Sequence, residues 1–319
     1  MDLTATEWRD SLILSREFAT PGERTDFFAR TRSGEFVAIY RGVYMPAAQW
    51  AALDESACYR TRVMAAAAFA GRELVFSHHS AAALWRLPWV GEWPRQAHVV
   101  EPLAAGGRSN GMLARHTVGV PEDIAHIDGL VATSLARTVV DLARAASFAS
   151  AVTIADADAA LRRTQYPFSG LPHSALTHED LFRQLDNVPP KQGSVKVRKV
   201  IEFANGAADR PGESLSRVNI RAAGLTMPQL QVTITGASGC SWTVDFWWPE
   251  FNVIGEFDGK FKYTDPEFLK GRTPAQAVYE EKLREDDLRA AGHGMSRWSW
   301  PIAISPRLLR EHLVAAGVR

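Results

Sequence analysis

Two apolar stretches decide how the C-terminal part of this chain folds: WTVDFWWP at residues 242–249 and NVIGEFDGKFKY at residues 252–263. Both are rich in aromatic and β-branched residues, which favour strands. Pro249 and Gly259 are turn formers that bound the two stretches. The pattern therefore predicts two neighbouring strands joined by a short turn.

Carboxylates interrupt these apolar strands. Side chains alternate between the two faces of a strand, so Glu256 and Asp258 share one face about 7 Å apart, and Lys260 follows at the same spacing. Asp245, on the preceding strand, can lie across from them. Ionised carboxylates are not buried among apolar groups unless a partner or a cation neutralises them. The pattern therefore predicts a hard divalent cation, Mg²⁺ or Mn²⁺, bound by oxygen ligands from Asp245, Glu256 and Asp258.

An Asp on one strand followed by acid-x-acid or acid-x-Lys on the next resembles the core of the PD-(D/E)XK restriction-endonuclease-like fold. Val-Asp-Phe-x-Trp-Pro followed by Glu-x-Asp-Gly is similar to the subgroup related to very-short-patch-repair endonucleases. That subgroup carries a Glu on a helix ahead of the sheet, which here is Glu213 in the motif PGES at residues 211–214. A charged helix at 280–292 and a strand at 295–300 complete the resemblance, which covers residues 196–319.

The resemblance implies roles for particular residues. Asp245 and an acid after the turn bind the metal, and Glu213 holds the metal or orients the attacking water. The register stays open between Glu256-x-Asp258 and Asp258-Gly259-Lys260 as the active pair. Further candidates for activating water, stabilising charge or contacting phosphate are Lys260, Lys262, Lys282 and Arg284.

The fold class expected for the whole chain is α+β and multidomain. Residues 1–48 are expected to form a winged-helix-like region, and residues 49–165 a mostly helical middle domain. Proline and glycine residues, which break helices and strands, cluster in residues 166–195. This composition predicts a linker with the domain boundary near 190–195. Residues 196–319 follow as an αβββαβ domain.

The N-terminal region contains GEFVAIYRGVY at residues 34–44, which predicts a small hairpin split at Arg41. This stretch resembles the wing of AbiEi-type antitoxins from abortive-infection toxin–antitoxin systems. Pro21 and Gly22 are expected to interrupt the preceding region, leaving residues 25–32 as a short candidate recognition helix. The resemblance makes Arg41 a candidate nucleic-acid contact, and the alternative is a small β-capped subdomain that touches no DNA.

In the middle domain, helices are expected at residues 47–71, 77–88 and 133–144, and a strand at 98–100. The motifs SHHSAA at 77–82 and RTVVDLA at 137–143 resemble the middle segment of the same antitoxin-like proteins. His78 and His79 are adjacent on a helix and have no Cys or Glu at ligand spacing, so they are expected to be cap and packing residues. Arg137 and Asp141 are expected to pair along their helix.

Composition limits the class of protein. The chain has 319 residues with no net charge, which argues against strong non-specific binding of nucleic acid. The two cysteines, Cys58 and Cys240, fit a reduced protein. The N-terminus lacks the pattern of a signal peptide, and no apolar run approaches the roughly 18 residues that span a membrane. A cytoplasmic location without a membrane partner is expected, and no Gly-rich phosphate loop or zinc-type cysteine cluster occurs.

Two functions follow as hypotheses. The first is a metal-dependent nucleic-acid phosphodiesterase in a defence, toxin–antitoxin or repair setting, with DNA as the expected partner and RNA left open. The alternative is a non-catalytic DNA-binding antitoxin or transcriptional regulator with an inactive nuclease fold and a cognate toxin as partner. The sequence leaves the oligomeric state open in both cases.

Overall fold

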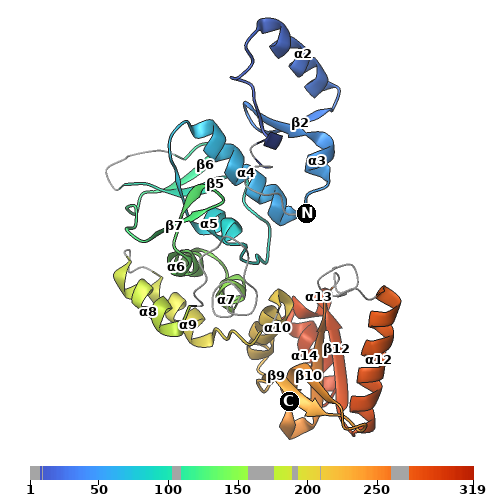
Figure 1. The fold of residues 1–319 in the computed structure, drawn as a ribbon. Helices are drawn as coiled ribbons and strands as arrows, with labels where there is room; N and C mark the ends of the chain where they lie inside the picture. Colours follow the sequence, from blue (N-terminus) through green and yellow to red (C-terminus); the bar gives the residue numbers. More distant parts are fainter. Residues whose placement is uncertain are drawn as a thin grey trace. The chain divides into compact units, whose positions relative to one another are not determined.

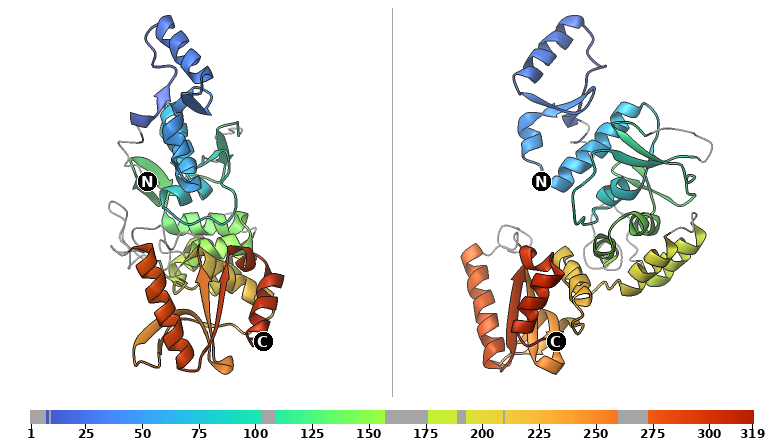
Figure 2. Two further views of the ribbon diagram at one scale, coloured as in Figure 1. Left: turned by 90° about the vertical axis from the view of Figure 1, so that its right-hand side faces the viewer. Right: turned by 180° about the vertical axis from the view of Figure 1, so that it is seen from behind.

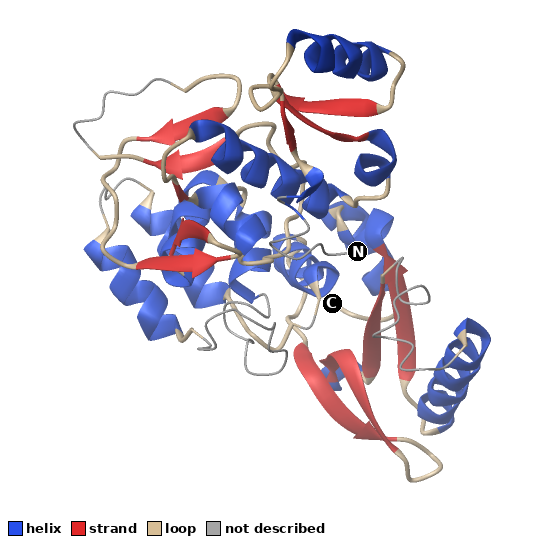
Figure 3. Cartoon of the chain, turned by 45° about the horizontal axis from the view of Figure 1, so that its top comes forward, coloured by secondary structure: helices blue, strands red, loops and turns tan. Residues whose placement is uncertain are grey.

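The computed structural model describes residues 8, 10–102, 109–156, 176–188, 193–208, 210–259 and 273–319. The chain divides into two compact units, and the second comprises Ala155–Ala157 and Phe203–Arg319 (Figure 1). Three separate sheets, drawn red in Figure 3, and the helices around them make a mixed α and β protein, as predicted. The unit boundary falls between Glu202 and Phe203, at the C-terminal end of helix α9 (Ser194–Phe203), whereas the sequence placed the boundary near 190–195. Within the described ranges, no helix combines the length and the apolarity needed to cross a bilayer.

The N-terminal sheet has the strand order β1 (Ile13–Leu14), β3 (Val43–Pro46), β2 (Phe36–Tyr40). The predicted hairpin is confirmed, and Gly42 adopts a φ of +91° in its turn. The short helix expected at residues 25–32 begins four residues earlier, because helix α2 spans Pro21–Arg32. A proline in the first helical turn loses no hydrogen bond, and Thr20 with Glu23 forms a capping box there.

The middle segment of the first unit contains the predicted helices with sharper ends. Two helices, α3 (Ala47–Ala51) and α4 (Glu55–Ala70), replace the single expected one because Asp54 caps a new helix. Helix α5 spans His78–Leu84, and α6 spans Leu135–Ala145. The first unit also holds α8 (His178–Asn187), and α7 spans Phe148–Asp156.

The prediction of a mostly helical segment missed a five-stranded sheet. Its order is β6 (Leu113–His116), β5 (Ala97–Val100), β4 (Val75–Phe76), β8 (Leu130–Thr133), β7 (Ile124–Ile127). Only β5 was expected from the sequence. The other strands are at most four residues long, and alternation over so few residues gives little signal.

The second unit is built on a four-stranded sheet. Helix α10 (Pro211–Ala222) precedes the antiparallel strands β9 (Gln229–Thr235), β10 (Ser241–Trp248) and β11 (Val253–Asp258). After the short η1 (Pro249–Phe251), β11 and α12 (Pro274–Ala290), strand β12 (Gly294–Ser299) returns parallel to β11. Helices α13 (Trp300–Ala303) and α14 (Pro306–Ala315) end the chain. The strands and helices expected here are present, while α13 was not predicted.

Helix α12 lies on one face of this sheet and helices α10 and α14 lie on the other (Figure 2), and apolar clusters fill both faces. The larger cluster joins Phe246, Trp248, Phe257 and Trp298 to residues of α10, α13 and α14. The smaller one joins Val244 and Ile254 to Leu288 of α12. Burial of a large apolar side chain stabilises by about 1.5–3 kcal/mol, so these clusters fix the positions of β10 and β11.

Candidate functional site

Asp245 lies on the central strand β10, opposite the end of β11. Its Oδ2 accepts a hydrogen bond from the backbone N–H of Phe257 at 2.9 Å. Its Oδ1 accepts a second bond, at 3.4 Å, from the side-chain amide of Gln231 on β9. Three adjacent strands therefore contribute to fixing the position of this carboxylate.

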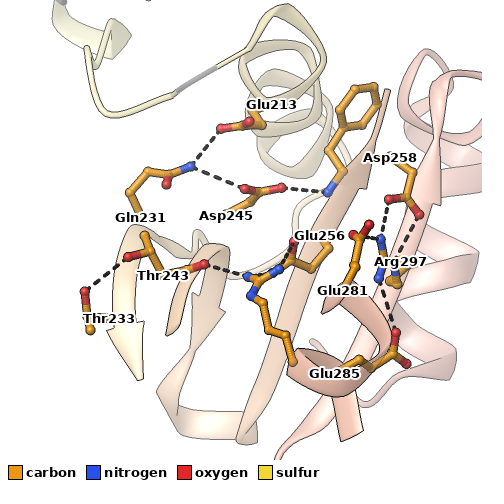
Figure 4. Close-up of polar contacts among 12 residues, drawn as sticks. Glu213, Gln231, Thr233, Thr243, Asp245, Glu256, Asp258, Glu281, Glu285 and Arg297 are labelled. Atoms are coloured by element: carbon orange, nitrogen blue, oxygen red, sulfur yellow. Dashed lines mark hydrogen bonds and ion pairs between the residues drawn. The ribbon is translucent and has the colours of Figure 1, made fainter. Parts of the chain in front are cut away.

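Gln231 also connects this carboxylate to helix α10. Its Nε2 donates to Glu213 Oε2 at 3.1 Å, as Figure 4 shows. Glu213 is buried, with 2% of its surface exposed. The preceding Gly212 allows the helix to approach the sheet, because a Cβ at this position would lie 2.0 Å from the ring of Phe257. The motif PGES thus positions Glu213 over the end of the sheet that holds Asp245.

The backbone is irregular at this point. Gln231 has a φ of +49°, although it is neither glycine nor in a turn. Val244 belongs to the cluster under α12, but Phe246 belongs to the opposite cluster, so the regular alternation of β10 breaks at Asp245. Such strain costs about 1–3 kcal/mol and concentrates at functional sites.

Glu256 is brought close to the same region on β11, and it is buried with 2% of its surface exposed. Arg284 of α12 binds both of its oxygens, at 2.7 Å from Nη2 and 3.4 Å from Nη1. The same Nη2 donates to the carbonyl oxygen of Thr243 at 2.5 Å. The sequence named Arg284 as a phosphate contact, and the structure shows that it neutralises Glu256.

Asp258 has a different partner. Both of its oxygens accept bonds from Arg297 on β12, at 3.1 and 2.6 Å. Arg297 also pairs with Glu281 and Glu285 of α12. Burial lowers the pKa of the Arg297 guanidinium, but the hydrogen bonds that Arg297 donates to Asp258 and Glu281 outweigh this effect. The pKa of the guanidinium is therefore raised. Arg297 and its acids thus form an ion-pair network beside the Asp245 group (Figure 4).

The basic candidates are dispersed. Lys260 and Lys262 lie outside the described residues, and Lys282 is exposed on α12. Arg41, in the first unit, is exposed and lines a cavity of about 1140 Å³. Three more arginines line that cavity: Arg24, Arg72 and Arg115.

Asp245 has the ligand type of a hard divalent cation, although among the described residues no three carboxylates converge closely enough to hold one. Carboxylate oxygens are the ligands of Mg²⁺, which uses one or two carboxylates and completes its octahedron with water and phosphate oxygens. Asp245 can supply one such carboxylate. A cation that also used Glu256 would compete with the guanidinium of Arg284.

Sequence reasoning missed two members of the site. Gln231 could have been found by counting the register of the 229–235 and 241–248 strands, which places it opposite Asp245. Arg297 gave no local signal, because its partners lie on a strand and a helix that only the tertiary fold brings together.

Comparison with known proteins yields relatives but no activity. No protein-family model matches the chain. The chain is 28% identical over 251 residues to two proteins of Mycobacterium tuberculosis, named Uncharacterized protein MT2308 (strain CDC 1551 / Oshkosh) and Uncharacterized protein Rv2248 (strain ATCC 25618 / H37Rv). Each alignment covers 78% of this chain and 84% of the relative.

Proposed function

We propose that the second unit is a restriction-endonuclease-like domain and that it cleaves phosphodiester bonds of nucleic acid with Mg²⁺ or Mn²⁺. The observation that carries the proposal is that Gln231 joins Glu213 of α10 to Asp245 of β10, while Glu256 lies on the neighbouring strand β11 (Figure 4). The order of elements in this unit, with β11 and β12 parallel across α12, supports the same assignment.

Each acidic residue has a distinct part in this proposal. Asp245 holds the metal ion, because its oxygens are oriented by Gln231 and the N–H of Phe257. The ion, when bound, polarises the scissile phosphate and lowers the pKa of the attacking water. Glu213 keeps Gln231 in place and so positions Asp245. Glu256 is the second carboxylate, available to the ion when Arg284 moves to a phosphate group.

The pairing of Glu256 with Arg284 favours a second candidate, a nuclease fold that binds nucleic acid without cleaving it. In that case Arg284 is a permanent internal partner, and binding falls to the first unit. The arginines around the cavity at Arg41 support that role, because clustered guanidinium groups attract phosphates. This candidate is an antitoxin-like regulator with DNA and a toxin as partners.

Nicking of supercoiled plasmid in Mg²⁺ or Mn²⁺ distinguishes the two candidates. Asp245→Asn and Glu256→Gln should each abolish nicking, whereas Asp286→Asn, a change at an exposed acid on the same unit, should not. The same comparison on single-stranded RNA separates the two nucleic acids. If the wild type cleaves neither substrate, or all variants cleave equally, the enzyme proposal is wrong. Loss of DNA binding in Arg41→Ala would then support the regulator.

A further inference from the structure

Three histidines that are far apart in the sequence meet in the first unit. One nitrogen from each of His78, His98 and His116 lies within 4.8 Å of the others. His98 Nδ1 and His116 Nε2 are 3.0 Å apart, and the rings of His78 and His116 stack with their centroids 3.8 Å apart. In the described part of the chain, this is the group of three or more His, Cys, Asp or Glu that converges closely enough to hold a metal ion.

The fold explains why these rings meet. In the parallel pair β5–β6, His98 is aligned with Ala114 and Val100 with His116, so both histidines lie on one face of the sheet. His78 is the first residue of α5, immediately after β4, which pairs with β5. The sequence prediction that His78 and His79 are cap and packing residues was incomplete. It considered ligands at helical spacing, whereas the partners come from two strands.

Two further observations mark the cluster as more than packing. His78 has a φ of +48°, a conformation that is uncommon for residues other than glycine, although His, Asn and Asp adopt it more often than most. The adjacent His79 packs at 4.8 Å from the ring of His98, and its Nδ1 is buried without a hydrogen-bond partner. Strain and an unsatisfied buried nitrogen both cost free energy, which an apolar core would avoid.

We propose that His78, His98 and His116 form a binding site for a borderline divalent metal ion of the Zn²⁺ class, with the fourth coordination position open. Imidazole nitrogens suit Zn²⁺, Co²⁺ and Ni²⁺, whereas Mg²⁺ prefers oxygen ligands. Two nitrogens that bind Zn²⁺ at 2.0–2.1 Å in a tetrahedron are about 3.3 Å apart. The distance of 3.0 Å between His98 Nδ1 and His116 Nε2 is already close to this separation. The ring of His78 must turn out of its stack to supply the third ligand.

The rings are in the protonation state that a metal needs. Burial lowers the pKa of His98 to about 3, and the neighbouring His79 and His116 add to this effect. Burial likewise lowers the pKa of His78 and of His116, so all three rings are neutral at pH 7. The charge of Arg137 also acts on His78, but Arg137 pairs with Asp141 at 2.8 Å, which limits repulsion of an added cation.

Serine side chains orient the ligands. Ser77 Oγ lies 3.0 Å from His78 Nδ1, which leaves Nε2 as the ligand atom of that ring. Ser80 Oγ accepts the backbone N–H of His98 at 2.7 Å and also contacts the hydroxyl of Tyr59. A partner such as Ser77, which contacts the ring itself, fixes ring orientation in metal sites, and its loss typically weakens metal binding by about 10–100-fold, whereas Ser80 holds the backbone at His98.

The test is titration of the tag-free, full-length, EDTA-treated chain with Zn²⁺ against a chromophoric chelator. One tight equivalent per chain is expected. His98→Asn and His116→Gln should each weaken it by more than about 100-fold, beyond the loss typical of an outer partner. His126→Gln is the matched control, because His126 is an exposed histidine on β7 of the same sheet. Asp245→Asn should also leave the tight site unchanged, which separates it from the acidic group of the second unit.

A second measurement does not depend on the variants folding. X-ray absorption of the wild type loaded with one equivalent of Zn²⁺ should show three imidazole ligands. Absence of a tight equivalent, fewer than three imidazoles, or unchanged affinity in folded His98→Asn would overturn the proposal. Cleavage of plasmid by the second unit has no bearing on these results.

Discussion

The pair formed by Arg284 and Glu256 gives a prediction that separates a metal site from a structural ion pair. Arg284→Met removes the guanidinium but keeps an apolar side chain of similar length. Breaking a buried ion pair costs about 3–5 kcal/mol. Arg284 keeps 19% of its side chain exposed and Glu256 has contacts besides those with Arg284, so the lower end, about 3 kcal/mol, is expected.

Mg²⁺ should reverse part of this loss. Without Arg284, its guanidinium no longer competes for Glu256, so an ion held by Asp245 gains access to a second carboxylate. An ion present at ten times its Kd stabilises the folded state by about 1.4 kcal/mol. Mg²⁺ should therefore stabilise Arg284→Met by roughly that amount, and the wild type by less.

The assay is hydrogen exchange of peptides from β10 and β11, which reports the opening free energy of the second unit alone. Arg289→Met is the control, because Arg289 lies on the same helix and pairs with Glu285 at the surface. Exposed pairs contribute about 0–1 kcal/mol. If Arg284→Met stays within 1 kcal/mol of the wild type, or if Mg²⁺ stabilises both proteins equally, the assignment of Glu256 as a second metal ligand fails.

Three other predictions rest on the same structure. Gly212→Ala should destabilise the second unit by about 1–3 kcal/mol in urea unfolding, since its Cβ would overlap the ring of Phe257; an unchanged midpoint would show that α10 shifts freely. Arg217→Met should cost about 3–5 kcal/mol in the same assay, because the carboxylate of Asp156, which Arg217 binds at 2.6 Å, is fully buried. In metal-free protein, acid should destabilise the first unit, because the pKa of His98 is lowered to about 3 in the folded state. Below about pH 6.5 the unfolded state therefore binds a proton at His98 that the folded state does not bind. The free energy of unfolding should fall by about 1.4 kcal/mol per pH unit as pH falls from 6.5 towards 3. Thermal melts between pH 8 and pH 4.5 measure this change. If the stability of the wild type depends on pH as weakly as that of His98→Asn, the prediction is wrong.

The sequence predicted the second unit well because its signals are local. Aromatic and β-branched residues are dense in β10 and β11, and the turn formers Pro249 and Gly259 bound them. Alternation placed Glu256 and Asp258 on one face. The sequence did not predict that Arg284 forms an ion pair with Glu256 and that Arg297 forms one with Asp258. Those pairs depend on how α12 and β12 pack on β11, which no spacing along the chain reveals.

In the first unit, by contrast, the sequence predicted less of the fold. Helices near α4, α5 and α6 were predicted from caps and breakers, whereas α7 was not, and the short strands of the five-stranded sheet gave too few residues for a period-2 pattern. The histidine cluster was missed for the same reason. Two of its members lie on β5 and β6, so without the sheet there was no reason to connect His98 and His116 to His78.

Backbone strain links the two candidate sites. Among the described residues, five other than glycine have a positive φ: His78, Arg86, Asp128, Gln231 and Asn252. Asp128 and Asn252 lie in connections between strands, where Asp and Asn tolerate this conformation well. Arg86 follows the end of helix α5. The remaining two are Gln231, which is inside a strand, and His78, which begins a helix and is a residue type found in this conformation more often than most. Each contacts a group of candidate ligands, Asp245 in one unit and His116 in the other. Backbone strain of this kind concentrates at functional sites, so the positive φ of Gln231 inside a strand adds to the argument for a site at Asp245.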